Sequence, residues 1–439
     1  MDDVTSPGST PRGLDAARDL LAFIDASPSP FHAVASAAAL LGAAGFSELD
    51  EAAPWPAGAG RHYVCRGGSL VAWATDPRHG PTSPFRIVGA HTDSPNLRVK
   101  PRPDADRVGY RQLAVEVYGG ALLNSWLDRD LGLSGRVVVR DGAGAAPQLL
   151  RIDRPLLRIP QLAIHLDREI GEHGLRLNPQ QHLSPVWGLG EPDPGAFSTL
   201  VADSIGVAPD AILGWDLMAH DLTPSTLAGA DDELISAPRL DNLCSSWAGL
   251  AGLRSAAEHP TASVPVLVLF DHEEIGSTSD RGAGSSLLPT VLERIGAGLD
   301  GTREDLFRAS AGSVCASADM AHATHPNYAD RHEPGHLIAL NAGPVLKVNS
   351  NVRYATDGAT AATFVLACEQ AGVPYQRYAH RSDLPCGSTI GPITAARLGI
   401  PTFDLGAPQL AMHSARELAG SADPAHYAAC LAAFLAPEG

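Results

Sequence analysis

Two adjacent carboxylates, Glu273 and Glu274, follow directly after an apolar run at residues 264–270. Such a run predicts a strand covered on both faces, so the polar residues at its end lie where an α/β sheet binds ligands. One carboxylate could bind a metal while its neighbour transfers protons, if the flexible Gly276 lets the chain bend. The alternative is a solvated acidic loop. The helical zinc motif HExxH is excluded, because Gly276 stands four residues after His272.

Other candidate ligands also follow strand-like runs. His91 and Asp93 come after FRIVGA, and His413 comes after PTFDLGA. In a His-x-Asp pair the aspartate can accept the second imidazole N–H, which orients a metal-binding histidine and raises its basicity. Asp241 opens a helix of small residues, where it is either a helix cap or a carboxylate that bridges two metals with its two oxygens. Asp319 lies in SADMAHATHPNY, beside further histidines.

These candidates combine imidazole and carboxylate groups without sulfur, a set that suits catalytic Zn²⁺, Mn²⁺ or Co²⁺. Two such ions about 3.5–4 Å apart, bridged by a carboxylate and a water, would polarise a carbonyl group and activate the water near neutral pH. A free carboxylate beside them would serve as general base. The six candidates are His91, Asp241, Glu273, Glu274, Asp319 and His413.

The composition indicates a soluble enzyme with a large core. The chain has 439 residues, 44% of them hydrophobic and 18% charged. This length predicts two domains, or one domain with an insertion. The formal charge of −17 opposes nonspecific binding to nucleic acid or anionic membranes. There is neither a signal-peptide pattern nor an apolar run of about eighteen residues, so we expect a cytoplasmic protein.

Several other chemistries are excluded by their missing signatures. The six cysteines include no CxxC pair, which favours reduced thiols and argues against a cysteine metal site. The letters of a dinucleotide fingerprint at residues 296–301 follow a helical stretch rather than a strand. The sequence contains no GxSxG for a serine hydrolase and no GxxxxGK[ST] for a nucleotide site.

The elements that position the candidates are expected to form an α/β domain with a mainly β insertion. Residues 1–96 and 235–439 have α/β texture, whereas 97–234 contain strand-like segments and many turns without βαβ alternation. The insertion would supply a lid or an assembly surface. His165 is its one histidine with a candidate function, and a core or rim position is the alternative.

The motifs together resemble those of the M18 aspartyl aminopeptidases. In chain order they are SPSPFHAV, GAHTDSPNLRVKP, IPQLAIHLDRE, RLDNLCSS, HEEIGS, SADMAHATHPNY, LPCGSTIGPI and LAMHSARE. The resemblance implies a zinc-peptidase-like three-layer α/β/α catalytic domain with an inserted dimerisation or lid domain. It implies an aminopeptidase that removes N-terminal Asp and Glu from peptides with two divalent ions, Zn²⁺ first and Mn²⁺ or Co²⁺ as alternatives. It also implies a homo-dodecamer built from dimers.

The resemblance assigns roles residue by residue. It implies four terminal metal ligands, namely His91, Glu274, Asp319 and His413. It implies that Asp241 bridges the two metals, that Glu273 is the general base and that Asp93 orients His91. Related co-catalytic metallopeptidases have a cis peptide bond after the bridging aspartate, so we expect one at Asp241–Asn242.

An acidic substrate on an acidic protein requires a local cation, because long-range charge is screened within about 8 Å. The family uses a lysine in the pocket for the N-terminal side chain, and GPVLKVNSNVRY offers Lys347, with Arg353 as the alternative. A strand lysine that reaches solvent is the simpler interpretation. His325 and His165 are the further substrate-binding candidates.

Two other functions remain open at this point. A related metal amidohydrolase, either a deacylase or a carboxypeptidase, would use the same six residues and differ only in its specificity loops. A non-catalytic scaffold relative would show a broken ligand set or a missing base, and neither is broken in this sequence.

Overall fold

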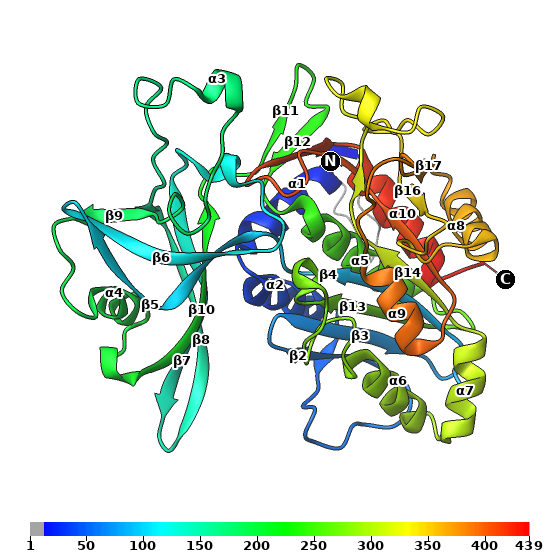
Figure 1. Cartoon of the computed structure of the whole chain (residues 1–439). Helices are drawn as coiled ribbons and strands as arrows, with labels where there is room; N and C mark the ends of the chain where they lie inside the picture. The colour runs from blue at the N-terminus through cyan, green and yellow to red at the C-terminus, as the bar shows by residue number, and fades with distance from the viewer. Residues whose placement is uncertain (1–12, 439) are drawn as a thin grey trace, which may run out of the picture.

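The computed structural model describes residues 13–438. Residues 1–12 and Gly439, which the expected catalytic segments include, lie outside the described part. Figure 1 shows two lobes side by side, one with helices on both sides of a sheet and one built mainly from strands. Within residues 13–438, no helix is both long enough and apolar enough to cross a bilayer.

The larger lobe is organised around a nine-stranded sheet. In spatial order its strands are β1 (Ser47–Glu48), β2 (Gly60–Arg66), β3 (Ser69–Thr75), β13 (Val264–Phe270), β4 (Phe85–His91), β14 (Val314–Ala318), β18 (Thr402–Gly406), β16 (Val345–Val348) and β17 (Gln376–Ala379). Strands β13, β4, β14 and β18 are parallel neighbours, so their carboxyl ends meet at one edge.

Helices cover both faces of this sheet. One face carries α1 (Gly13–Ala26), α2 (Pro30–Ala43), α5 (Leu240–Glu258), α8 (Gly358–Ala371) and α10 (Asp423–Leu435). The other carries α6 (Leu287–Gly298), α7 (Arg303–Ala311) and α9 (Ile390–Leu398). In β13, Leu267 and Leu269 join the first core, whereas Val266 and Val268 join the second. This alternation explains why the strand is apolar throughout, and it confirms the predicted three-layer α/β/α fold.

The smaller lobe is a six-stranded antiparallel sheet inserted after β4. In spatial order its strands are β8 (Gly144–Leu157), β7 (Leu131–Asp141), β10 (Ile212–Asp221), β5 (Asn96–Arg107), β6 (Tyr110–Tyr118) and β9 (Val186–Leu189). Helix α4 (Ala196–Ile205) packs Phe197 and Val201 into the core of this lobe, and the short α3 (Ile170–His173) lies at its periphery in Figure 1.

A third, small sheet receives the chain as it returns from the insertion. Its order is β11 (Thr226–Ala228), β12 (Leu234–Ala237), β20 (Glu417–Gly420), β19 (Pro408–Leu410) and β15 (Ala321–His322). β11 falls within the segment that the sequence assigns to the insertion, yet it pairs with β12 of this sheet. The 3-10 helices are η1 (Leu123–Trp126), η2 (Pro209–Ala211), η3 (Glu273–Ile275) and η4 (Ala329–Arg331).

Polar contacts fix the two lobes to each other. Ser134 Oγ of β7 donates to the Pro28 carbonyl at 3.1 Å, and the guanidinium of Arg136 lies 4.5 Å from the centre of the Phe31 ring. Where the chain leaves the insertion, the Arg416 guanidinium donates to the carbonyls of Thr223 at 2.8 Å and Pro224 at 2.6 Å. These contacts hold the β lobe against the start of α2 and the small sheet.

The buried His32 at this junction predicts a loss of stability in mild acid. Burial, followed by Arg151, lowers the pKa of His32 to about 4. Below pH 6.5 the unfolded chain binds a proton that the folded chain rejects, so stability is full above pH 6.5 and falls towards pH 4, by up to about 3 kcal/mol. We expect His32→Gln to remove this part of the pH dependence, as measured by urea unfolding at pH 7 and pH 4.5.

The exposed His173 provides the matched control, because His173→Gln changes a histidine of α3 that is open to solvent. The change in the free energy of unfolding between pH 7 and pH 4.5, compared between the two variants, isolates the contribution of the His32 side chain. Equal acid sensitivity of wild type and His32→Gln would contradict the prediction.

Candidate metal centre

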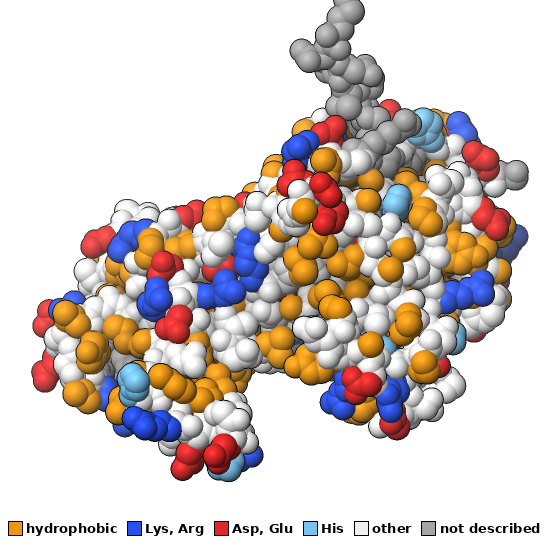
Figure 2. Space-filling model, turned by 90° about the horizontal axis from the view of Figure 1, so that it is seen from above, with side chains coloured by type: hydrophobic (Ala, Val, Ile, Leu, Met, Phe, Trp, Pro, Cys, Tyr) orange, Lys and Arg blue, Asp and Glu red, His pale blue; other side chains and the backbone are white. Residues whose placement is uncertain are grey.

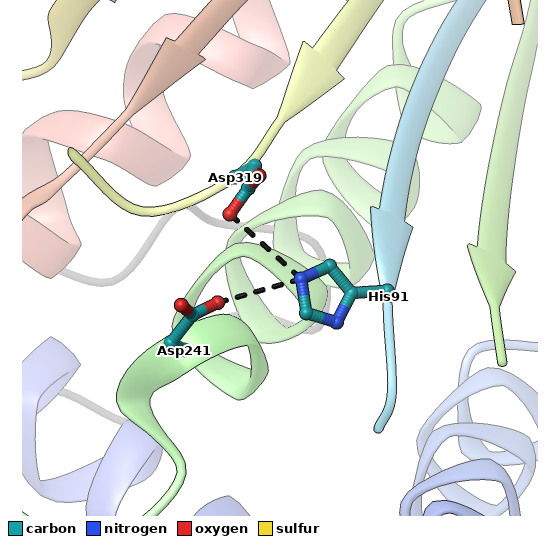
Figure 3. Close-up of side chains that lie close together, drawn as sticks. All are labelled: His91, Asp241 and Asp319. Carbon is teal, nitrogen blue, oxygen red and sulfur yellow. Dashed lines mark ion pairs between the residues drawn. The ribbon is translucent and has the colours of Figure 1, made fainter. Parts of the chain in front are cut away.

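The carboxyl edge of the parallel strands brings the polar candidates together. His91 ends β4, Asp319 follows β14, and Glu273 begins η3 just after β13. Asp241 comes from the start of α5, and Figure 3 shows His91, Asp241 and Asp319 converging from three separate elements. His413 stands in the turn between β19 and β20.

The spacing of the donor atoms suits shared cations rather than hydrogen bonds. His91 Nε2 lies 3.4 Å from Asp241 Oδ1 and 3.7 Å from Asp319 Oδ1. His413 Nε2 lies 3.4 Å from Asp241 Oδ2 and 3.4 Å from Glu274 Oε2. Ordinary N–H···O bonds span about 2.7–3.2 Å. Ligands about 2.0–2.1 Å from a tetrahedral ion are instead about 3.3–3.4 Å apart, which three of these pairs match, whereas the His91–Asp319 pair is wider at 3.7 Å.

Asp241 belongs to two groups of potential ligands at once. One group comprises His91, Asp241 and Asp319, the other Asp241, Glu274 and His413, and in each the donor atoms lie within 4.8 Å of one another. Asp241 Oδ1 and Glu274 Oε1 are buried and have no hydrogen-bond partner within the described part of the chain. A buried carboxylate oxygen without a partner is costly, so these residues fit a group that supplies positive charge. The arrangement can therefore hold divalent ions.

The backbone around Asp241 is held from several sides. The Asp241–Asn242 peptide bond is cis, which confirms the prediction. Ser94 Oγ donates to the Asp241 carbonyl at 2.6 Å, and Asn242 Nδ2 donates to the Ala318 carbonyl at 2.9 Å. These bonds link the start of α5 to the ends of β4 and β14, where the other candidates stand.

Asp93 is fully buried, and it contacts other residues of the site besides His91. Its backbone carbonyl lies 3.0 Å from His91 Nδ1, closer than its own carboxylate at 3.4 Å. The carboxylate instead accepts the backbone N–H groups of Glu273 and Glu274, both at 3.1 Å, and the hydroxyl of Tyr118 at 2.6 Å. Asp93 thus aligns the acidic pair with His91.

The electrostatics show how strongly this site favours positive charge. Burial, with a smaller contribution from Asp319 and other nearby carboxylates, raises the pKa of Glu273 to about 8 against the opposing effect of His91. Burial alone would lower the pKa of His413, but Asp241 and Glu274 raise it to about 10. Burial would likewise lower the pKa of His91, and contacts with Asp241 and Asp319 raise it. These raised pKa values show that Glu273, His413 and His91 bind protons more readily than usual. Bound divalent cations would offset the same repulsion between the neighbouring carboxylates.

Glu417 is a site residue to which the sequence analysis assigns no role. Its buried carboxylate accepts the backbone N–H of Asp241 at 3.0 Å through Oε2 and that of His413 at 2.7 Å through Oε1. It thereby fixes the two residues that face each other across the second ligand group. Its position four residues after His413 is the only sequence signal, and that spacing predicts no contact with Asp241.

The predicted substrate-binding residues lie at different distances from this cluster. Lys347 is buried beside it: Nζ donates to the Met320 carbonyl at 3.0 Å and lies 3.8 Å from Asp319 Oδ2. The alternative, Arg353, is exposed. His325 is half-buried and stacks edge-on with a tyrosine, and His165 is exposed. Among the described residues, neither histidine side chain makes an ion pair or hydrogen bond with the cluster.

Comparison with known proteins gives a consistent match over most of the chain. The family model described as aminopeptidase I zinc metalloprotease (M18) matches residues 23–435. A Mycobacterium leprae protein named probable M18 family aminopeptidase 2 is 57% identical over 426 residues, which cover 96% of this chain and 99% of the relative.

Solved structures with the same fold agree. A chain from the cryo-EM structure of an Ape4 and Nbr1 complex has a TM-score of 0.92 at 38% identity, covering 96% of this chain and 85% of that chain. The S. cerevisiae mApe1 dodecamer has a TM-score of 0.84 at 28% identity, covering 96% of each chain.

The contacts of Glu417 predict that Glu417→Gln weakens metal binding. The amide presents an NH₂ group to one of the two backbone N–H donors, so Asp241 or His413 loses its anchor. Loss of such a supporting contact typically costs about 10–100-fold in metal affinity. We expect a loss of this size for Zn²⁺, measured by titration against a competing chelator. Glu369→Gln on the exposed side of α8 is the control, and identical affinities for the two variants would refute the assigned role.

Proposed function

We propose, from the premise that this chain belongs to the M18 family of zinc metallo-aminopeptidases, that it removes N-terminal Asp and Glu from peptides with the help of two divalent metal ions. The observation that carries the proposal is the placement of Asp241, whose two oxygens face His91 and His413 separately at 3.4 Å. A carboxylate so placed is suited to bridging a pair of ions.

The two ligand groups suggest how the ions would be held. His91, Asp319 and Asp241 Oδ1 would hold one ion, and His413, Glu274 and Asp241 Oδ2 the other. Zn²⁺ agrees with the description of the family, and Mn²⁺ or Co²⁺ would suit the same donors. Such a pair of ions, when bound, supplies Lewis acidity towards the scissile carbonyl and lowers the pKa of water.

Glu273 is the proposed general base. Its carboxylate belongs to a group with His91 and Glu274 whose donor atoms lie within 4.8 Å of one another. The carboxylates 3.4 Å from Nε2 of His91 and of His413 are, however, those of Asp241 and Glu274. The bond from its backbone N–H to Asp93 fixes its place at the start of η3. It would accept a proton from the attacking water at a carboxylate oxygen and pass it to the leaving amine.

Lys347 is the proposed source of selectivity for acidic residues. Its ammonium group is buried, and among residues 13–438 only one of its three N–H donors is used in a hydrogen bond, to the Met320 carbonyl. A second donor would be available to the carboxylate of an N-terminal Asp or Glu. The nearby Asp319 places this cation at the edge of the proposed metal pair.

We also propose that the chain forms a homo-dodecamer of dimers through residues 97–234, as a dimerisation or lid domain. The S. cerevisiae relative is a dodecamer. The segment around His165 exposes Leu162, Ile164 and Leu166 at 56%, 58% and 75%, which is an unusual surface for a free monomer. Substrate contacts of His165 and His325, and a cytoplasmic location, stay predictions.

Glu273→Gln tests the catalytic assignment. The amide cannot take up the proton, so kcat should fall at least about 10²-fold while the metal content stays near that of wild type. The measurement combines steady-state kinetics on Asp-p-nitroanilide with elemental analysis of the purified protein. If the substitution emptied the metal centre instead, the roles of Glu273 and Glu274 would have to be exchanged.

Lys347→Met tests the substrate class. Wild type should hydrolyse Asp- and Glu-p-nitroanilides in preference to Leu-p-nitroanilide and N-acyl amino acids, and Lys347→Met should reduce kcat/KM on Asp by about 10²-fold or more with little change on Leu. A substrate carboxylate buried without its partner explains the loss.

The exposed Arg353 gives the matched variant, and Arg353→Met should keep the preference for acidic residues. The metal content of both variants distinguishes a loss of substrate selectivity from a loss of metal caused by a displaced Asp319. Equal losses on all substrates would show that Lys347 supports the fold. A preference of wild type for N-acyl substrates would favour the amidohydrolase hypothesis.

A further inference from the structure

We propose that the β insertion supplies positioning groups to the metal centre of the larger lobe: the Tyr118 hydroxyl, at the end of β6, and the Gly120 carbonyl, two residues after it. The inference rests on the proposed function, because it concerns how this chain holds the residues that would bind the ions. None of the sequence motifs that identify the family contains either residue.

Tyr118 acts on the His91 side of the site. Its hydroxyl donates to Asp93 Oδ2 at 2.6 Å, and the same oxygen accepts the Glu274 N–H at 3.1 Å. The ring is buried, with the Arg98 guanidinium 4.1 Å from its centre. Burial and the neighbouring Asp93 raise the pKa of Tyr118, so the hydroxyl keeps its proton and serves as a donor. Tyr118 thus fixes the carboxylate that aligns the acidic pair.

Gly120 acts on the His413 side. Its carbonyl oxygen lies 3.0 Å from His413 Nδ1, so Nδ1 carries a proton that it donates to this carbonyl, and Nε2 faces Asp241 and Glu274. The backbone continues this contact, because the Leu122 N–H donates to the His413 carbonyl at 3.0 Å. The insertion therefore holds the Nδ1 side of the His413 ring, opposite the carboxylates that face Nε2.

The close approach of the insertion requires the two glycines. A Cβ at Gly119, where φ is +72°, would lie 3.1 Å from Glu274 Cβ, and one at Gly120 would lie 3.2 Å from His413 Nδ1. A segment that merely covered the site would tolerate small side chains at a greater distance. Here the chain lies against Glu274 and His413 themselves, one residue after the Tyr118 bond to Asp93.

The test compares Tyr118→Phe with Tyr110→Phe in the full chain. Both residues belong to β6, and Tyr110 is exposed at the far end of the strand. Tyr118→Phe keeps the ring beneath Arg98 and removes only the hydroxyl. We expect Tyr118→Phe to weaken Zn²⁺ binding by about 10–100-fold against a competing chelator. We also expect it to shift the visible absorption of the Co²⁺-substituted protein and to lower kcat more than it raises KM.

Gly120→Ala provides a second, independent variant in case Tyr118→Phe folds poorly. Its Cβ would displace the His413 ring, so it should weaken Zn²⁺ binding and shift the Co²⁺ spectrum without touching Asp93. Wild-type metal affinity and Co²⁺ spectra in both variants, matching those of Tyr110→Phe, would overturn the inference while leaving the proposed function intact. A wild-type chain that binds no divalent ion would overturn the proposed function and this inference together.

Discussion

The arrangement depends on one electrostatic constraint, the burial of several carboxylates around the two oxygens of Asp241. Close carboxylates repel one another in a medium of low dielectric constant. Two of them are held in place by backbone N–H groups: Asp93 by those of the acidic pair, Glu417 by those of Asp241 and His413. A fold that places so many carboxylates close together is suited to binding cations that neutralise their charge.

The parallel part of the sheet explains why the sequence revealed most of this site. β13 is buried on both faces, so its apolar run stops where the sheet ends and polar residues follow. The same reasoning found His91 after FRIVGA, which is β4, and the structure places Asp319 beside it because the ends of the adjacent parallel strands β4 and β14 coincide. The three-layer architecture and the family were predicted correctly because eight motifs follow one another in the order that the resemblance requires.

The groups that the sequence did not reveal act through the backbone or across long distances in the chain. Glu417 binds the N–H of a residue that is 176 positions away, and an N–H carries no mark in the sequence. Tyr118 closes a β strand of the insertion and has no motif around it. The end of the insertion was also hard to locate, because β11 has the same short-strand texture as the insertion and differs only in its pairing with β12.

The Arg416 contacts connect the junction between the lobes to the metal centre. Arg416 precedes Glu417 in the sequence, and its guanidinium donates hydrogen bonds to the carbonyls of Thr223 and Pro224, where the chain leaves the insertion. Tyr118, at the end of β6 in the insertion, and Gly120, just after it, lie against Asp93 and His413. Two segments of the β lobe are thus coupled to residues of the site, so a neighbouring subunit bound to this lobe would bias the geometry of the metal ligands. Subunit association and ligand alignment would then be linked equilibria, each shifting the population of the other.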